Sequence, residues 1–273
     1  MVRRAAVILI SFLFVAALGP FWQGGEKGQV ARVIDGDSFV LNSGLVVRMA
    51  QIEAPRIRTG DDAGVLARAA LNSLVAGKTV ELKYGGMRRD RSGRALAQVF
   101  VSNGLLNEPI WVNIEILKAG HARVHTYYDN RARIEDFWQA EREARRAARG
   151  IWAKPAYQVR YATPEALIGA DGSYQLIEGK IASIEQTSSL IKLYFGNDKQ
   201  TQVAALIPMR AWQLWPEGIN AINALQGRDI RIRGRINPAQ SARESKANKR
   251  QFAAHGPQIW LDHPEQIEFI IRR

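Results

Sequence analysis

The stretch QVARVIDGDSFVLNSGLVVRMAQI, residues 29–52, determines the fold of the first part of the chain. Its apolar residues alternate or run together at strand length, which predicts strands at 29–34, 38–42 and 45–52. Asp35-Gly36-Asp37 and Ser43-Gly44 separate these segments and are residues typical of tight turns. The stretch therefore predicts three consecutive strands joined by short turns.

Working outward, two further strands and three helices complete the first block. The expected strands are 79–84 and 95–101, and the expected helices are 62–76, 112–119 and 134–148. In the first helix one apolar stripe is predicted to face the core, formed by Val65, Leu66, Ala69, Ala70 and Leu74. Five strands with helices inserted late favour a small barrel of the α+β class over a parallel α/β sheet.

Three motifs within this block carry polar side chains suited to phosphate chemistry. They are residues 33–38 (VIDGDS), 47–56 (VRMAQIEAPR) and 89–97 (RDRSGRALA). Each motif alone is weak, but their order and spacing are more specific. Arg48 and Arg94 stand out because planar guanidinium groups bind phosphate oxygens as a fork and stabilise charge in a phosphoryl transition state.

With these motifs in order, the chain resembles the staphylococcal nuclease family over residues 28–152. The resemblance continues through 111–113 (WVN), 118–120 (KAG), 124–128 and 150–152 (GIW). It implies a barrel of the oligonucleotide/oligosaccharide-binding (OB) type with three helices, which cleaves DNA and RNA phosphodiesters with Ca²⁺. Calcium is the expected cofactor, and other divalent cations stay open because an altered ligand set changes the cavity.

The resemblance also implies roles for individual residues. Asp37 falls on the first Ca²⁺ carboxylate, and Glu53 falls where a second carboxylate, usually Asp, is expected. Ala54 falls on a position that offers its backbone oxygen to the metal site. Arg48 and Arg94 fall on the two arginines that hold the scissile phosphate. Tyr128 falls on an aromatic beside the bound nucleotide, whereas Thr126 replaces a second tyrosine there.

Arg56 departs from the family pattern. The family places Glu directly after the proline, as the group that activates or orients the attacking water, and arginine cannot act as a base because its pKa stays above about 12. Arg56 opposes a bound cation and favours a phosphate. Asp61 and Asp62 follow on the next loop and either substitute for the missing carboxylate or cap the following helix; we expect the cap.

The rest of the chain predicts a second module. After a linker at 158–172, residues 173–273 carry expected strands at 174–185, 190–195, 202–207, 228–236, 258–262 and 266–270, with a helix at 216–225. Residues 228–236 alternate between apolar and basic, so one face of that strand is strongly basic. Glycines at strand bends favour a second OB-like barrel, and the polar, basic loop 238–256 either binds nucleic acid or is a solvated loop.

The ends of the chain and its charge bear on compartment and partners. Residues 1–22 carry Arg3-Arg4 and then an uncharged apolar run, typical of a signal peptide or a membrane anchor. We therefore expect an extracytoplasmic protein, membrane-bound through this segment if it is not cleaved, with residues 23–157 as the nuclease-like domain. The chain has 273 residues, a net charge of +12 and no cysteine, which excludes disulfides and thiolate chemistry and favours acidic partners such as DNA or RNA.

Three functions remain open at this stage. The first is an exported nuclease whose competence depends on how Arg56 is tolerated. The second is a non-catalytic module that binds nucleic acid or a protein. The third is an envelope protein that uses its basic faces on anionic lipid or polysaccharide.

Two further groups of residues have both a functional and an ordinary interpretation. His121 and His125 are four residues apart, as in some metal sites, but we expect them to be loop or strand residues. The arginines at 142, 145, 146 and 149 either bind phosphate or form a solvated helix face.

Overall fold

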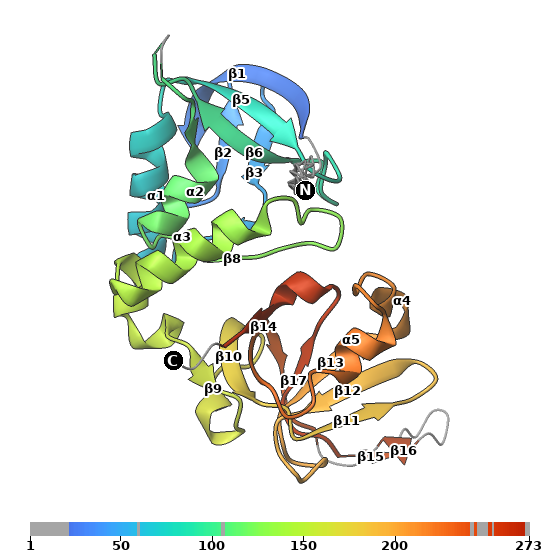
Figure 1. Cartoon of the computed structure of the whole chain (residues 1–273). Helices are drawn as coiled ribbons and strands as arrows, with labels where there is room; N and C mark the ends of the chain where they lie inside the picture. The colour runs from blue at the N-terminus through green and yellow to red at the C-terminus, as the bar shows by residue number, and fades with distance from the viewer. Residues whose placement is uncertain are drawn as a thin grey trace, which may run out of the picture.

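The computed structural model describes residues 22–58, 61–104, 107–240, 243–244, 251–252 and 254–270. The expected signal or anchor segment, apart from Trp22, and most of the basic loop after residue 240 lie outside these residues. Among the described residues, no helix is both long enough and apolar enough to cross a membrane. Figure 1 shows an upper and a lower half, with helix α3 (Ile134–Arg146) running along the boundary between them.

A closed five-stranded barrel forms the upper half, as the sequence predicts. Its strands are β1 (Gln23–Val33), β2 (Ser38–Leu41), β3 (Val46–Met49), β5 (Thr79–Tyr84) and β6 (Ala95–Val101). Neighbours pair antiparallel in the order β3-β2-β1-β5-β6, and a parallel pairing of β3 with β6 closes the ring. The short strand β7 (Ile110–Trp111) pairs antiparallel with β6, and β4 (Ile52–Glu53) pairs separately with β8 (Arg123–Val124).

Helices α1 (Ala63–Val75) and α2 (Val112–Lys118) complete the upper half together with α3. The predicted apolar stripe of α1 is wrong in part. Val65 and Leu66 are 43% and 47% exposed, whereas Ala70 and Leu74 pack against the core. The centre of the buried face is formed by Ala63, Ala67, Leu71 and Val75. A Cβ on Gly36 would lie 2.5 Å from the Cβ of Ala67, so the helix approaches the Asp35–Asp37 turn closely because residue 67 is small.

A second, open sheet forms the lower half. Its path runs β11 (Ser183–Gln186), β12 (Leu190–Tyr194), β13 (Ala204–Pro208), β17 (Gln258–Trp260), β14 (Asp229–Asn237), β10 (Tyr174–Lys180) and β9 (Arg160–Tyr161), with β18 (Ile267–Phe269) on β14. Short helices α4 (Met209–Trp212) and α5 (Ile219–Asn223) pack beside it, and β15 (Arg243–Glu244) pairs with β16 (Gln251–Phe252). Within the described residues the recorded pairings leave β11 and β9 at the two ends of the path, so an OB-like closure stays a prediction.

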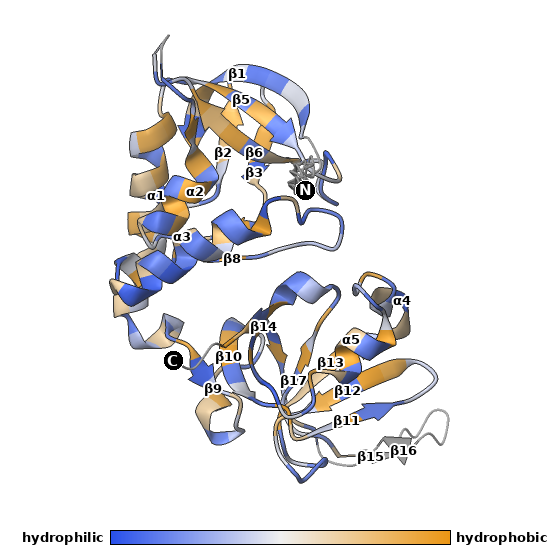
Figure 2. Cartoon of the chain, in the orientation of Figure 1, coloured by the Kyte–Doolittle hydropathy of each residue, from blue (hydrophilic) through white to orange (hydrophobic). Residues whose placement is uncertain are grey.

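Each half has its own apolar core, and a third, smaller cluster joins them. In Figure 2 apolar strands occupy the interior of both halves, while α3 between them is largely hydrophilic. The joining cluster contains Ala144, Ile151 and Trp152 from the first half and Tyr174 and Leu176 from the second. The predicted linker also contributes to the second core, because Ala162, Leu167 and Ala170 are buried there. The two halves are therefore packed directly against each other.

Candidate phosphate-binding site

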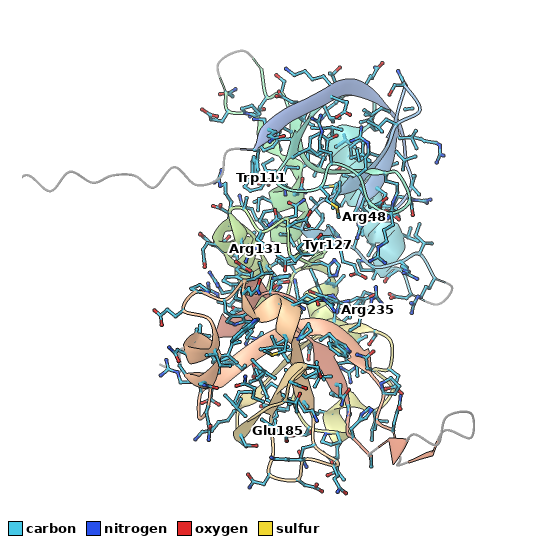
Figure 3. The ribbon with its side chains drawn as sticks, turned by 90° about the vertical axis from the view of Figure 1, so that its right-hand side faces the viewer. Arg48, Trp111, Tyr127, Arg131, Glu185 and Arg235 are labelled. Atoms are coloured by element: carbon cyan, nitrogen blue, oxygen red, sulfur yellow. The ribbon has the colours of Figure 1, made fainter. Side chains whose placement is uncertain are left out.

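A polar cleft of about 290 Å³ opens where the barrel meets the second sheet. It is lined by Asp35, Asp37, Ser38, Arg48, Glu53, Ala54, Pro55, Arg56, Arg94, His125, Tyr127 and Arg235. Figure 3 labels Arg48 and Tyr127 on the barrel side and Arg235 just across the boundary, on the second sheet. The structure thus brings six of the seven predicted site residues together: Asp37, Arg48, Glu53, Ala54, Arg56 and Arg94.

Asp37 lies at the centre of the barrel side of the cleft. The packing of Gly36 against α1 holds the turn that carries Asp37. Asp37 as a whole is only 5% exposed. One carboxylate oxygen accepts a hydrogen bond from the backbone N–H of Ala54 at 2.7 Å, and the other accepts one from the Ser38 hydroxyl at 2.9 Å. Because Arg48 forms an ion pair with the same carboxylate, both oxygens of Asp37 are engaged.

Arg48 and Arg94 meet because of the pairing that closes the barrel. The parallel register of β3 and β6 sets Arg48 opposite Leu96, two residues after Arg94. Burial lowers the pKa of Arg48, against the opposing influence of Tyr127, Glu53 and Asp35, and the nearby Arg94 lowers it further. A buried guanidinium group with a second cation beside it is strongly stabilised when an anionic ligand binds.

The turn before β6 holds Arg94 in place. The Asp90 carboxylate accepts hydrogen bonds from the backbone N–H groups of Ser92 and Arg94, at 2.8 and 3.0 Å, and forms an ion pair with Nε of Arg94 at 2.7 Å. Gly93 has a φ of +76°, a conformation that glycine adopts without strain. Since Asp90 uses Nε, the two Nη groups of Arg94 are left outside this contact and suit a forked interaction with phosphate.

Glu53 lies at the other side of the cleft, between two basic side chains. Its Oε1 is 3.1 Å from Nη2 of Arg235, and its Oε2 is 3.8 Å from Nε2 of His125. Burial lowers the pKa of His125 to about 4, against the opposing charge of Glu53, so this imidazole is neutral at neutral pH. Arg235 is therefore the charged partner of Glu53.

The aromatic side chain in the cleft is Tyr127, whose neighbour Tyr128 is 54% exposed and is not among the lining residues. A contact between Tyr128 and a bound nucleotide stays a prediction. Asp61 and Asp62 also lie outside the lining: the Asp61 carboxylate accepts the N–H of Ala63 at 3.0 Å and the Tyr157 hydroxyl at 3.0 Å. The contact with Ala63 fits the expected role of Asp61 at the start of α1. Asp62 occupies the N-cap position, but its side chain makes no capping hydrogen bond and pairs with Lys154 instead.

Sequence reasoning missed Asp35, Tyr127 and Arg235 as lining residues and did not connect His125 with this cleft. Tyr127 follows directly from its position beside the predicted aromatic. The alternating pattern placed Arg235 on a basic strand face, but no pattern linked it to Glu53, which lies 182 residues earlier.

The family's Ca²⁺ ion does not fit this arrangement of side chains. Calcium takes six to eight oxygen ligands, usually with several carboxylates. Here both oxygens of Asp37 are engaged by Arg48, Ser38 and Ala54, and Arg235 places a positive charge beside Glu53. In the described part of the chain, no group of three or more His, Asp or Glu side chains is arranged to hold a metal. Ala54 contacts Asp37 through its N–H, and a metal contact of its carbonyl stays a prediction.

The barrel is closed and five-stranded, and its cleft gathers two arginines and a buried aspartate, a set of side chains suited to an anionic ligand. Comparison with known sequences agrees: the family model described as "Staphylococcal nuclease homologue" matches residues 46–154. An uncharacterized endonuclease of Escherichia coli is 36% identical over 153 residues, covering 55% of this chain and 90% of the relative. The chain therefore belongs to the staphylococcal nuclease family.

Two other relatives share a similar extent of the chain. The thermonuclease of Staphylococcus hyicus is 28% identical over 166 residues, 55% of this chain and 92% of the relative. The micrococcal nuclease of Shigella flexneri is 31% identical over 162 residues, 57% of this chain and 87% of the relative. The family match ends at residue 154, before the second sheet begins, so that sheet is outside the family assignment.

Proposed function

We propose that the protein binds DNA or RNA in this cleft, with Arg48 and Arg94 gripping the phosphodiester. The observation that carries the proposal is the presence of these two guanidinium groups beside Asp37 in one cleft, Arg48 from strand β3 and Arg94 from the turn before β6. Asp37 acts as a positioning residue, because its ion pair fixes the direction of the Arg48 fork. The cleft is then ordered for an anion before the ligand arrives.

We further propose that the protein hydrolyses the bound phosphodiester slowly. In this reaction a water oxygen bonds to phosphorus, the ester P–O bond breaks, and a proton passes to the leaving oxygen. Arg56 stands where the family has its water-activating Glu, and losing a general base typically costs about 10²–10⁴ in rate. Asp35 is the cleft carboxylate outside the recorded ion pairs of the described residues, so we assign it the role of accepting the proton from water.

A second candidate function is binding without cleavage. The ion pairs of Asp37 with Arg48 and of Glu53 with Arg235 favour it, because they neutralise the two carboxylates that the family directs toward Ca²⁺. In both candidates the ligand is nucleic acid, and the two differ only in turnover.

We also propose that the second sheet is OB-like. We propose further that the protein acts outside the cytoplasm; this location rests on the sequence of residues 1–22, and cell fractionation tests it.

The decisive experiment uses the full chain with plasmid, single-stranded DNA and RNA, first in Ca²⁺ and then in EDTA. Cleavage that disappears in Arg48→Ala supports the enzyme and places its activity in this cleft. Calcium-dependent cleavage would show that the metal displaces Arg235 or Arg48 from its carboxylate. Salt-sensitive binding with no cleavage in either condition supports the binding module. Absence of both binding and cleavage would refute the proposed function.

A further inference from the structure

Strand β14 carries a row of arginines on one face. Arg231, Arg233 and Arg235 alternate with residues that face the second core, such as Ile232 and Ile236, as the period-two pattern predicts. Arg231 pairs within its own half, with Glu178 and Glu268, whereas Arg233 and Arg235 contact the first half. The basic face is not free for a ligand along its length. Arg233 is only 1% exposed and lies between the two halves.

Arg233 locks β14 onto the barrel half. Its Nη2 lies 3.0 Å from Glu141 of α3 and 3.3 Å from Glu268 of β18, and its Nη1 donates to the carbonyl of Val124 at 3.3 Å. The Tyr174 hydroxyl donates to the same carbonyl at 2.8 Å. This anchor holds the position of Arg235, two residues further along the same face, relative to the cleft.

Arg235 lies at the edge of the cleft with part of its guanidinium accessible. Nη1 donates to the carbonyl of Gly172 at 3.0 Å, and Nη2 meets Glu53 at 3.1 Å. Its side chain is 51% exposed. A half-exposed ion pair contributes little to stability, so the contact with Glu53 is easily exchanged for a stronger anionic partner. A phosphate is such a partner, because guanidinium and phosphate form forked, charge-assisted hydrogen bonds.

We propose that Arg235 is a substrate-positioning residue, through which the second sheet contacts a phosphate of the bound strand beside the one held by Arg48 and Arg94. This inference rests on the proposed function of the cleft. On binding, Arg235 transfers its Nη2 contact from Glu53 to the phosphate and keeps its contact with Gly172. The second sheet is then part of the nucleic-acid site rather than an appendage to it.

The test measures binding of a fluorescein-labelled single-stranded oligonucleotide to the full chain by anisotropy, in EDTA and at several salt concentrations. Arg235→Ala is expected to weaken binding about tenfold, as for one lost charge-assisted hydrogen bond. The slope of log K against log salt should fall by about 0.7, the value for one phosphate contact on a single strand. Arg210→Ala is the matched control, because Arg210 is an exposed arginine of the same half, paired with Asp262 and absent from the cleft lining.

A double-mutant cycle separates a specific contact from general charge. Glu53→Gln releases Arg235 and should tighten binding, and the gain should shrink when Arg235 is already alanine. Additive effects of the two changes would contradict an exchange of partners. Arg235→Lys, which keeps the charge but loses the fork, should fall between the wild-type protein and Arg235→Ala. Thermal unfolding of each variant checks that the two halves remain docked.

The outcomes also distinguish this inference from the proposed function. If Arg48→Ala abolishes binding while Arg235→Ala behaves like Arg210→Ala, the cleft binds nucleic acid and the role of Arg235 is refuted. If Arg48→Ala and Arg235→Ala both leave binding unchanged, the proposed function itself fails. Tighter binding or faster cleavage by Arg235→Ala would instead make the Glu53 contact inhibitory, which also overturns the inference.

Discussion

Replacing Arg233 by Met should strongly destabilise the whole protein. Methionine is an unbranched, apolar side chain that fills much of the same space. The substitution therefore removes the cation from a site that is 1% exposed. Glu141, whose side chain is fully buried, then keeps its ion pair with Arg145 at 3.3 Å and the hydrogen bond from the backbone N–H of Val124 at 2.8 Å. Breaking a buried ion pair on one side typically costs about 3–5 kcal/mol, and we expect the lower end of this range because Arg145 still compensates part of the Glu141 charge. For a chain of this size, that corresponds to a loss in Tm of roughly 6–20 °C.

The assay is thermal and urea unfolding of the full chain, followed by circular dichroism. Adding Glu141→Gln to Arg233→Met should recover part of the loss, since the uncompensated charge is then removed. Arg210→Ala, which breaks an exposed pair, should change stability by less than about 1 kcal/mol. A loss no larger than this control in Arg233→Met would refute the view that Arg233 holds the two halves together.

Three further predictions address the cleft and the interface. Arg56→Glu should raise the rate of plasmid cleavage by about 10²–10⁴, measured at saturating DNA, and an unchanged rate would show that Arg56 is not the defect. Gly36→Ala should lower the free energy of unfolding by about 1–3 kcal/mol, because the new methyl group would lie 2.5 Å from Ala67 Cβ and 2.6 Å from Ala54 Cβ; urea unfolding measures it. Burial raises the pKa of Glu268, but four arginines led by Arg145 outweigh that effect and hold the pKa below 4.5. The Glu268 carboxylate therefore stabilises the folded protein above pH 4.5, and this stabilisation is lost as the pH falls through the pKa of the folded state. Unfolding measured from pH 7 to pH 3 should show this loss, and Glu268→Gln should flatten the profile.

Local pattern predicted the barrel well, because its strands are short, regular and bounded by turn residues. The strands expected at 79–84 and 95–101 coincide with β5 and β6, and the helix expected at 134–148 contains α3. The buried face of α1 was predicted only in part, for a tertiary reason. Hydrophobicity favoured Val65 and Leu66, whereas the close approach of Gly36 turns Ala67 toward the barrel and leaves those two residues exposed.

The family motifs located most of the cleft, because they lie in one block of the chain. What they did not show was the partner of each side chain. The arginines at 142 and 145 pair with Glu268, and Arg145 also pairs with Glu141, whereas Arg146 and Arg149 are exposed. Such contacts depend on how two separate sheets dock, and a sequence pattern of period two or 3.6 carries no information about docking.

The order in which the chain is made gives the Arg233 anchor a consequence for biogenesis. Glu141 emerges from the ribosome first, and Arg233 follows about ninety residues later. Until β14 has been made, Glu141 lacks its partner from the second sheet, and the cleft lacks the side that carries Arg235. The two halves can therefore dock, and the cleft can be completed, only after β14 has been synthesised.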